Sequence, residues 1–172
     1  MAAGQTYEPI ATNTLSSATT SVTFSSIPST YTDLVIIAQA GVTAVSNAGY
    51  MRVGNSSVDT GSNYSTTYFI GSGTTASSGR YTNSSIGVSF YQPGYGTPTV
   101  LTTTGVSNIM NYANTTTYKT IISRSGAAGT SAEVGVGLWR STAAINIITL
   151  YPEASTTWVS GSIFTLYGIA AA

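Results

Sequence analysis

Short runs of β-branched and aromatic residues recur along nearly the whole chain, separated by clusters of Gly, Pro, Ser, Thr and Asn. The runs follow one another at intervals of about 8 to 12 residues, which is typical of antiparallel sandwiches and barrels. No stretch has a convincing helical period, and no repeat of fixed length recurs. The sequence therefore predicts an all-β fold, a single antiparallel β-sandwich of roughly ten strands. We expect one domain over residues 1–172, with residues 1–6 as an extended N-terminal arm.

Two apolar runs near the C-terminus give the most specific strand prediction. One ends in Thr149-Leu150-Tyr151 and is followed by Pro152, and the other ends in Thr165-Leu166-Tyr167 and is followed by Gly168. Strand interiors rarely keep proline or glycine, so we expect the strands to stop there. Apolar residues occupy both alternating sets of positions in each run, which is typical of strands covered on both faces. Both runs are therefore predicted to be central strands.

Other strands are predicted from alternation and from apolar runs that end at turn residues. The section 71–85 is rich in Ser, Gly and Thr and carries no strand prediction. The predicted strands are 7–15, 20–27, 34–41, 49–53, 64–70, 86–91, 100–101, 106–112, 117–123 and 133–140.

The run 133–140 alternates cleanly and makes a further prediction about its two faces. Val134, Val136 and Leu138 share one set of positions, so we expect them to point into the core. Trp139 is out of phase with them and is expected to face outward as a candidate subunit contact. The glycines between the valines indicate close approach by another backbone.

Charge and composition narrow the classes of function. Charged residues make up 6% of the chain, and five basic and five acidic side chains give a formal net charge of zero. The basic residues are scattered singly, whereas nucleic-acid binding draws on clustered Lys and Arg, so we expect no nucleic-acid partner. We also expect no membrane span and no signal peptide, because no long apolar segment is present. A nearly uncharged, hydroxyl-rich surface favours a protein that is packed against partners.

The residues that most enzymes depend on are missing. The chain has no His and no Cys, which removes Ser-His-Asp triads and the commonest zinc ligands. Asp59, Gly61 and Asn63 have the alternate spacing of a calcium loop, but without a closing Glu an ordinary Asx turn is favoured. A glycan hydrolase built on Asp59 or Glu133 is the weakest alternative. We therefore predict no enzymatic activity, no cofactor and no metal.

Aromatic side chains beside Ser/Gly/Asn-rich connections are the candidates for binding. Such mixtures of rigid rings and small hydrogen-bonding residues are used by binding surfaces, and the rings can also stack on sugars. The competing and favoured explanation is that the rings form cross-strand pairs and cover sheet edges. The candidate contacts with a partner or glycan are Tyr64, Tyr68, Tyr81, Tyr91, Tyr95, Trp139 and Trp158.

Two segments carry a resemblance to a known group of proteins. The first is Ser21-Val-Thr-Phe-Ser-Ser-Ile-Pro-Ser-Thr-Tyr-Thr-Asp-Leu34, with Tyr7-Glu-Pro-Ile-Ala-Thr12 before it. The second is the ending, with Ile148-Thr-Leu-Tyr-Pro152 and Gly161-Ser-Ile-Phe-Thr-Leu-Tyr-Gly-Ile169. These segments resemble short virion structural proteins of tailed bacteriophages, especially phages of marine bacteria and cyanobacteria. The resemblance covers nearly the whole chain apart from its middle.

The resemblance implies a jelly-roll-like sandwich on the outside of a phage particle, made in the host cytoplasm. We expect a non-enzymatic virion protein, foremost a head decoration or cement protein on the capsid surface. Its expected partners are further copies of itself, with a trimer favoured, and other virion proteins such as the major capsid protein. The alternative is a receptor-binding module of a tail fibre or other appendage, which would hold a host surface glycan.

Overall fold

A computed structural model describes residues 6–44, 48–91, 103–127, 130–153 and 156–170. These residues contain thirteen strands and no helix, so nothing in the described part of the chain could cross a membrane as a helix. The predicted arm falls almost entirely outside the described residues, and the first strand begins at Tyr7.

The strands form two sheets, and every pair in them is antiparallel. The larger sheet contains β1 (Tyr7–Thr14), β3 (Asp33–Ala40), β6 (Tyr64–Ser72), β7 (Thr75–Ser84), β9 (Thr103–Ile109), β10 (Lys119–Ala127), β11 (Ser131–Trp139) and β13 (Ile163–Ile169). The smaller sheet contains β2 (Val22–Phe24), β4 (Gly49–Asn55), β5 (Ser57–Val58), β8 (Val88–Tyr91) and β12 (Ile147–Pro152).

Eight of these strands follow the order of a jelly roll. They are β1, β2, β3, β4, β8, β9, β12 and β13, and the larger sheet joins four of them as β1-β13-β3-β9. The smaller sheet joins the other four, with β12 between β2 and β4 and with β8 on the far side of β4. Counted along the chain, this places the first, eighth, third and sixth strands in one sheet and the second, seventh, fourth and fifth in the other. The predicted antiparallel, jelly-roll-like sandwich is confirmed.

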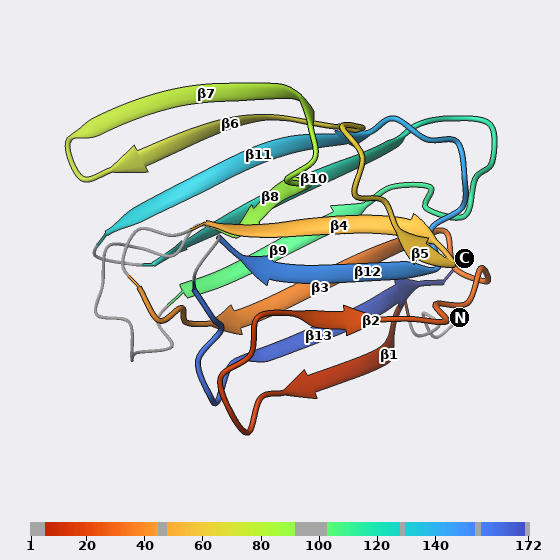
Figure 1. Cartoon of the computed structure of the whole chain (residues 1–172), viewed down its shortest axis with the longest axis horizontal. Helices are drawn as coiled ribbons and strands as arrows, with labels where there is room; N and C mark the ends of the chain where they lie inside the picture. The colour runs from red at the N-terminus through yellow and green to blue at the C-terminus, as the bar shows by residue number, and fades with distance from the viewer. Residues whose placement is uncertain (1–5, 45–47, 92–102, 128–129, 154–155, 171–172) are drawn as a thin grey trace, which may run out of the picture.

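Two insertions widen the larger sheet. One carries β5, β6 and β7 between β4 and β8, and the other carries β10 and β11 between β9 and β12. The larger sheet continues past β9 as β10-β11-β6-β7, and Figure 1 shows β6 and β7 beyond the smaller sheet. The inner face of this extension is therefore covered only in part by the smaller sheet.

The core lies between the two sheets and is centred on Trp158. This side chain is fully buried and packs edge-on against Phe90 of β8 and Phe164 of β13. Its backbone forms isolated bridges to Thr19 and Val42. One residue outside the named strands thus joins the smaller sheet to the larger one.

The orientation predicted for β11 is wrong. Val134 and Val136 are 55% and 49% exposed, whereas Trp139 is 3% exposed and belongs to the core. The inner positions of β11 are Glu133, Gly135, Gly137 and Trp139. A Cβ at Gly137 would lie 2.1 Å from a methyl carbon of Val88, so a side chain of β8, and not a backbone as predicted, approaches this glycine closely. Because β8 lies against it, the inner face of β11 has no room for large side chains at its centre.

The two C-terminal runs are central strands, as predicted, but each is buried on one face. β13 lies between β1 and β3, and β12 lies between β2 and β4. Ile163 is 36% exposed on the open face of β13, and no described strand forms a further layer over that face. β12 ends at Pro152 as expected, whereas β13 continues through Gly168. The ring of Tyr31 fills the place where a side chain of Gly168 would lie, with a ring carbon 2.3 Å from an ideal Cβ.

Candidate functional site

Three of the candidate contact residues belong to the interior. Tyr64 and Trp158 are fully buried, and Trp139 is 3% exposed. The Tyr64 hydroxyl accepts from the Val53 N–H, and its single proton has two acceptors within reach, the carbonyl oxygens of Val53 at 3.0 Å and Asp59 at 2.9 Å, which ties β6 to β4. These rings hold the two sheets together and are not available to a partner, which corrects their assignment as surface contacts.

The predicted Asx turn at Asp59 is confirmed, and it also anchors a core residue. Asp59 Oδ1 accepts from the Gly61 N–H at 2.7 Å. Asp59 Oδ2 accepts from the Trp139 indole N–H at 2.7 Å and from the Asn63 side-chain amide at 2.8 Å. Partial burial raises the pKa of Asp59, but these hydrogen bonds outweigh it and leave the pKa below its ordinary value. The carboxylate oxygens are thus already taken up by protein donors.

Asp59 is expected to make folding sensitive to acid. Because its pKa is lower in the folded chain than in the unfolded one, its stabilisation is present above the unfolded pKa of about 4 and is lost as the pH falls through the folded pKa. The Asp59→Asn variant should lose about 1–3 kcal/mol of unfolding free energy at pH 7. Its amide nitrogen cannot accept the hydrogen bonds that Oδ2 accepts from Trp139 and Asn63. Urea unfolding at pH 7 and pH 3 measures both effects. An equal acid loss in wild type and variant would contradict the assignment.

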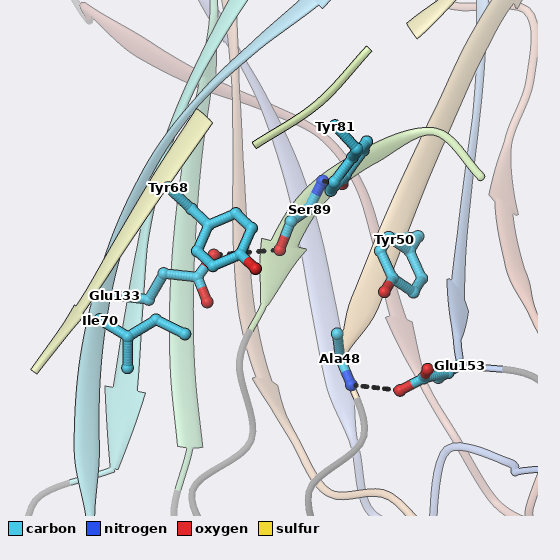
Figure 2. Close-up of a pocket in the computed structure, with 8 residues that line it drawn as sticks. All are labelled: Ala48, Tyr50, Tyr68, Ile70, Tyr81, Ser89, Glu133 and Glu153. Carbon is cyan, nitrogen blue, oxygen red and sulfur yellow. Dashed lines mark hydrogen bonds between the residues drawn. The ribbon is translucent and has the colours of Figure 1, made fainter. Parts of the chain in front are cut away.

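Two other candidates, Tyr68 and Tyr81, line one groove of about 250 Å³ at the junction between the insertions and the jelly roll. Its lining residues are Ala48, Tyr50, Tyr68, Ile70, Tyr81, Ser89, Glu133 and Glu153. Tyr68, Ile70, Tyr81 and Glu133 come from the insertions. Tyr50 and Ser89 lie on β4 and β8, Ala48 directly precedes β4, and Glu153 directly follows β12. Figure 2 shows Tyr68, Ile70 and Glu133 on one side, Ala48, Tyr50 and Glu153 on the other, and Ser89 with Tyr81 between them.

Each tyrosine of the groove has a local cause for its position. Tyr68 pairs with Gly79 on β7, and a Cβ there would lie 2.5 Å from the Tyr68 hydroxyl oxygen, so this glycine makes room for the ring. The Tyr81 hydroxyl accepts from the Ser89 N–H at 3.0 Å, which fixes β7 to β8. Tyr50 stacks at a tilt on Tyr151, with ring centroids 5.9 Å apart.

Glu133 is the buried charge of the groove. It is 5% exposed, and its Oε1 accepts from the Ser89 hydroxyl at 3.0 Å. No described residue that lines the groove is basic. Burial therefore raises the pKa of Glu133, and the hydrogen bond from Ser89 opposes this only in part. The ionised carboxylate has little compensation within the groove.

Glu153 is exposed and lies on the other wall, beside Ala48. Its Oε2 is 3.4 Å from the Ala48 nitrogen, and Figure 2 shows the carboxylates of Glu133 and Glu153 on opposite sides. Glycoside hydrolysis commonly uses two carboxyl groups that flank one bond, and here the two carboxylates are held by different partners on opposite sides of the groove.

Sequence reasoning named only two of the groove residues as contacts. It missed Tyr50 and Ser89, and it considered Glu133 only for hydrolysis. The available signal was a carboxylate at the start of the Val-Gly alternation of 134–137, because a charge in line with the alternating positions of an apolar strand is unusual. The side chain of Tyr91 and all of Tyr95 lie outside the described residues.

The outer face of the larger sheet is the second candidate surface. Register places Ile37, Val106, Arg124, Val134 and Phe69 in one row across β3, β9, β10, β11 and β6. Val35, Asn108, Ile122, Val136 and Thr67 form the row beside it. Phe69 and Val134 are more than half exposed, and Ile122 and Val136 are nearly so. Contiguous apolar exposure of this kind marks interaction sites.

This outer face also has a hollow and carries positive charge. A hollow of about 280 Å³ lies over β6, β7 and β11, and Arg80, Val136, Leu138 and several hydroxyl side chains line it. Arg80 and Arg124 have no hydrogen bond or ion pair within the described residues. Neither row contains an acidic residue. The face therefore combines apolar side chains with two uncompensated positive charges.

Comparisons with known proteins do not assign the chain. No family model matches it, and no curated protein matches it. Among solved structures, an aerolysin-like protein from Bombina maxima aligns with 86% of this chain and 93% of its own, at 8% identity and a TM-score of 0.12. A likeness this low carries no argument about fold or function. The resemblance to phage virion proteins stays a prediction.

Proposed function

We propose that this chain is a non-enzymatic structural protein of a tailed-phage virion, a head decoration or cement protein that sits on the capsid surface. The observation that carries the proposal is the outer face of the larger sheet. On β11 the valines point to solvent while Glu133 and two glycines point inward. The strand therefore exposes its apolar side chains, which a monomer would be expected to bury. A partner that covers this face would remove from water the apolar surface that folding leaves exposed, and this burial would favour binding.

The partner that fits this face is a capsid protein presenting apolar side chains and carboxylates. Arg80 and Arg124 favour an acidic partner, because each lacks a counter-charge within the described residues. Two copies meeting through this same face would bring these cations together without any carboxylate between them. Homo-oligomers, with a trimer favoured, would form through other surfaces and present several outer faces at once. Such multivalency strengthens attachment without new contacts.

Particles tagged on this protein test the proposal. Electron microscopy should show the tag over the head, and stripping the protein should lower the resistance of the particles to heat or pressure. Mock-treated particles that keep the protein are the control. A tag found on the tail, or resistance unchanged after complete stripping, would contradict a cement role.

The alternative, a receptor-binding module of a tail fibre or appendage, is favoured by one observation. Tyr68 and Tyr81, two of the rings expected to hold glycan, lie in the same groove as Tyr50. A tag at the tail tip together with glycan-dependent attachment to cells would support this alternative over the capsid assignment.

A further inference from the structure

The groove and the outer face lie on opposite sides of the same sheet. Glu133 points into the groove, and its neighbour Val134 points out of the opposite face, because successive residues of a strand alternate. A protein attached through Val134 and its neighbours would keep the groove open. The groove can therefore have a ligand of its own, whichever part of the particle carries the protein.

The hydrogen-bonding groups of the groove favour a ligand that donates hydrogen bonds. Within the described part of the chain Glu133 accepts one hydrogen bond, through Oε1, and Figure 2 shows its other oxygen facing the open space. The hydroxyls of Tyr50 and Tyr68 have no hydrogen bond within the described residues, and Figure 2 shows both directed between the walls. Burial, and then the charge of Glu153, raise the pKa of Tyr50, so its hydroxyl keeps its proton at neutral pH.

The charge of the groove selects against several classes of ligand. Glu133 and Glu153 line it without any basic residue among the described lining, so phosphates, carboxylates and nucleic acid are repelled. A neutral ligand with several hydroxyls avoids this repulsion and supplies donors to the carboxylate. The aromatic rings and Ile70 offer apolar surface to the C–H groups of the same ligand.

Size limits the ligand further. A groove of about 250 Å³ is smaller than the roughly 300–1,000 Å³ of sites for drug-sized ligands. It fits one small ring rather than an extended chain. The open side toward solvent leaves room for the rest of a larger molecule to continue outward.

We infer that this groove binds a single neutral pyranose unit of a saccharide. Glu133 accepts hydrogen bonds from two neighbouring sugar hydroxyls, and the hydroxyls of Tyr50 and Tyr68 bond to the remaining ones. The rings of Tyr68 and Tyr81 and the side chain of Ile70 contact the apolar edge of the sugar.

The test is titration of the whole protein with methyl glycosides of glucose, galactose, mannose and N-acetylglucosamine, followed by NMR. At least one glycoside should shift the amide signals of Ser89 and Glu133 with a millimolar Kd. Methyl glucuronide should bind more weakly than the matching neutral glucoside, because its carboxylate meets those of Glu133 and Glu153.

Glu133→Gln separates binding from folding. The amide keeps an acceptor for Ser89, so the fold should persist, but it should weaken glycoside binding about tenfold or more by removing a charged acceptor. Its unfolding free energy at pH 8 should equal or exceed that of wild type. The raised pKa means that ionised Glu133 costs stability, and this cost grows as the pH rises from the unfolded pKa toward the folded one.

Val134→Ala is the matched control, because it changes the next residue on the opposite face and should leave glycoside affinity unchanged. Three results would overturn the inference: no glycoside shifts the groove signals, Glu133→Gln binds as wild type does, or tetramethylammonium binds the groove more tightly than every glycoside. None of these results would contradict the proposed capsid role, which depends on the outer face.

Discussion

Replacement of Trp158 by alanine is expected to lower the free energy of unfolding by about 3–5 kcal/mol. The side chain is fully buried and contacts Phe90 and Phe164 with ring centroids 6.2 Å and 5.2 Å away. Since these two rings belong to different sheets, the cavity would open at the place where the sheets meet. The neighbouring strands are held by backbone ladders and cannot collapse fully into it.

Urea unfolding followed by circular dichroism measures this loss. Val134→Ala is the control, because an exposed side chain on the outer face should change the free energy of unfolding by about 0.5 kcal/mol or less. A loss below about 1 kcal/mol for Trp158→Ala would show that this ring does not join the two sheets.

The double variant Phe69→Asp, Val136→Asp is expected to weaken attachment to stripped phage particles about a hundredfold, or about 2.7 kcal/mol. Both side chains are about half exposed on the outer face, so folding does not depend on burying them. In the assembled particle each new carboxylate would have to be desolvated in an apolar contact and would face the acidic partner surface that we propose. Co-sedimentation of purified protein with stripped particles gives the affinity.

Ser57→Asp is a control for an added carboxylate elsewhere on the surface, because Ser57 is exposed on the short strand β5 of the other sheet. It should attach as wild type does. Unfolding free energies for both variants within about 1 kcal/mol of wild type would show that attachment and not folding has changed. If the double variant attaches as tightly as wild type, the outer face is not part of the interface.

Strand positions in the jelly roll could be predicted because local alternation and turn residues agree with the fold there. β3 lies within one residue of its expected bounds, and β12 and β13 end within two residues of their expected ends. β7 was missed because it is an edge strand whose Ser, Gly and Thr side chains are mostly exposed. Its pairing with β6 arises from register and a tight turn at Gly73, where φ is +61°. No amphipathic pattern is needed for such a strand.

The faces of β11 and the groove could not be predicted, for a common reason. The alternation of β11 was recognised, but hydrophobicity alone assigned its valines to the core. Which face is inward depends on β8, whose Val88 lies against Gly137, and β8 is distant in sequence. The groove likewise joins Tyr50, Tyr68 and Glu133 from separate strands across the junction of the insertions with the jelly roll. Contacts between such distant segments leave no local pattern.

Hydroxyl-radical footprinting of the protein on intact particles, compared with the free protein, tests the central claim most directly. We predict that Phe69, Val134 and Val136 are oxidised in the free protein and strongly protected on the particle, while Tyr50 in the groove reacts similarly in both. Equal oxidation of the outer face in the two states, or protection confined to the groove, would contradict attachment through the larger sheet.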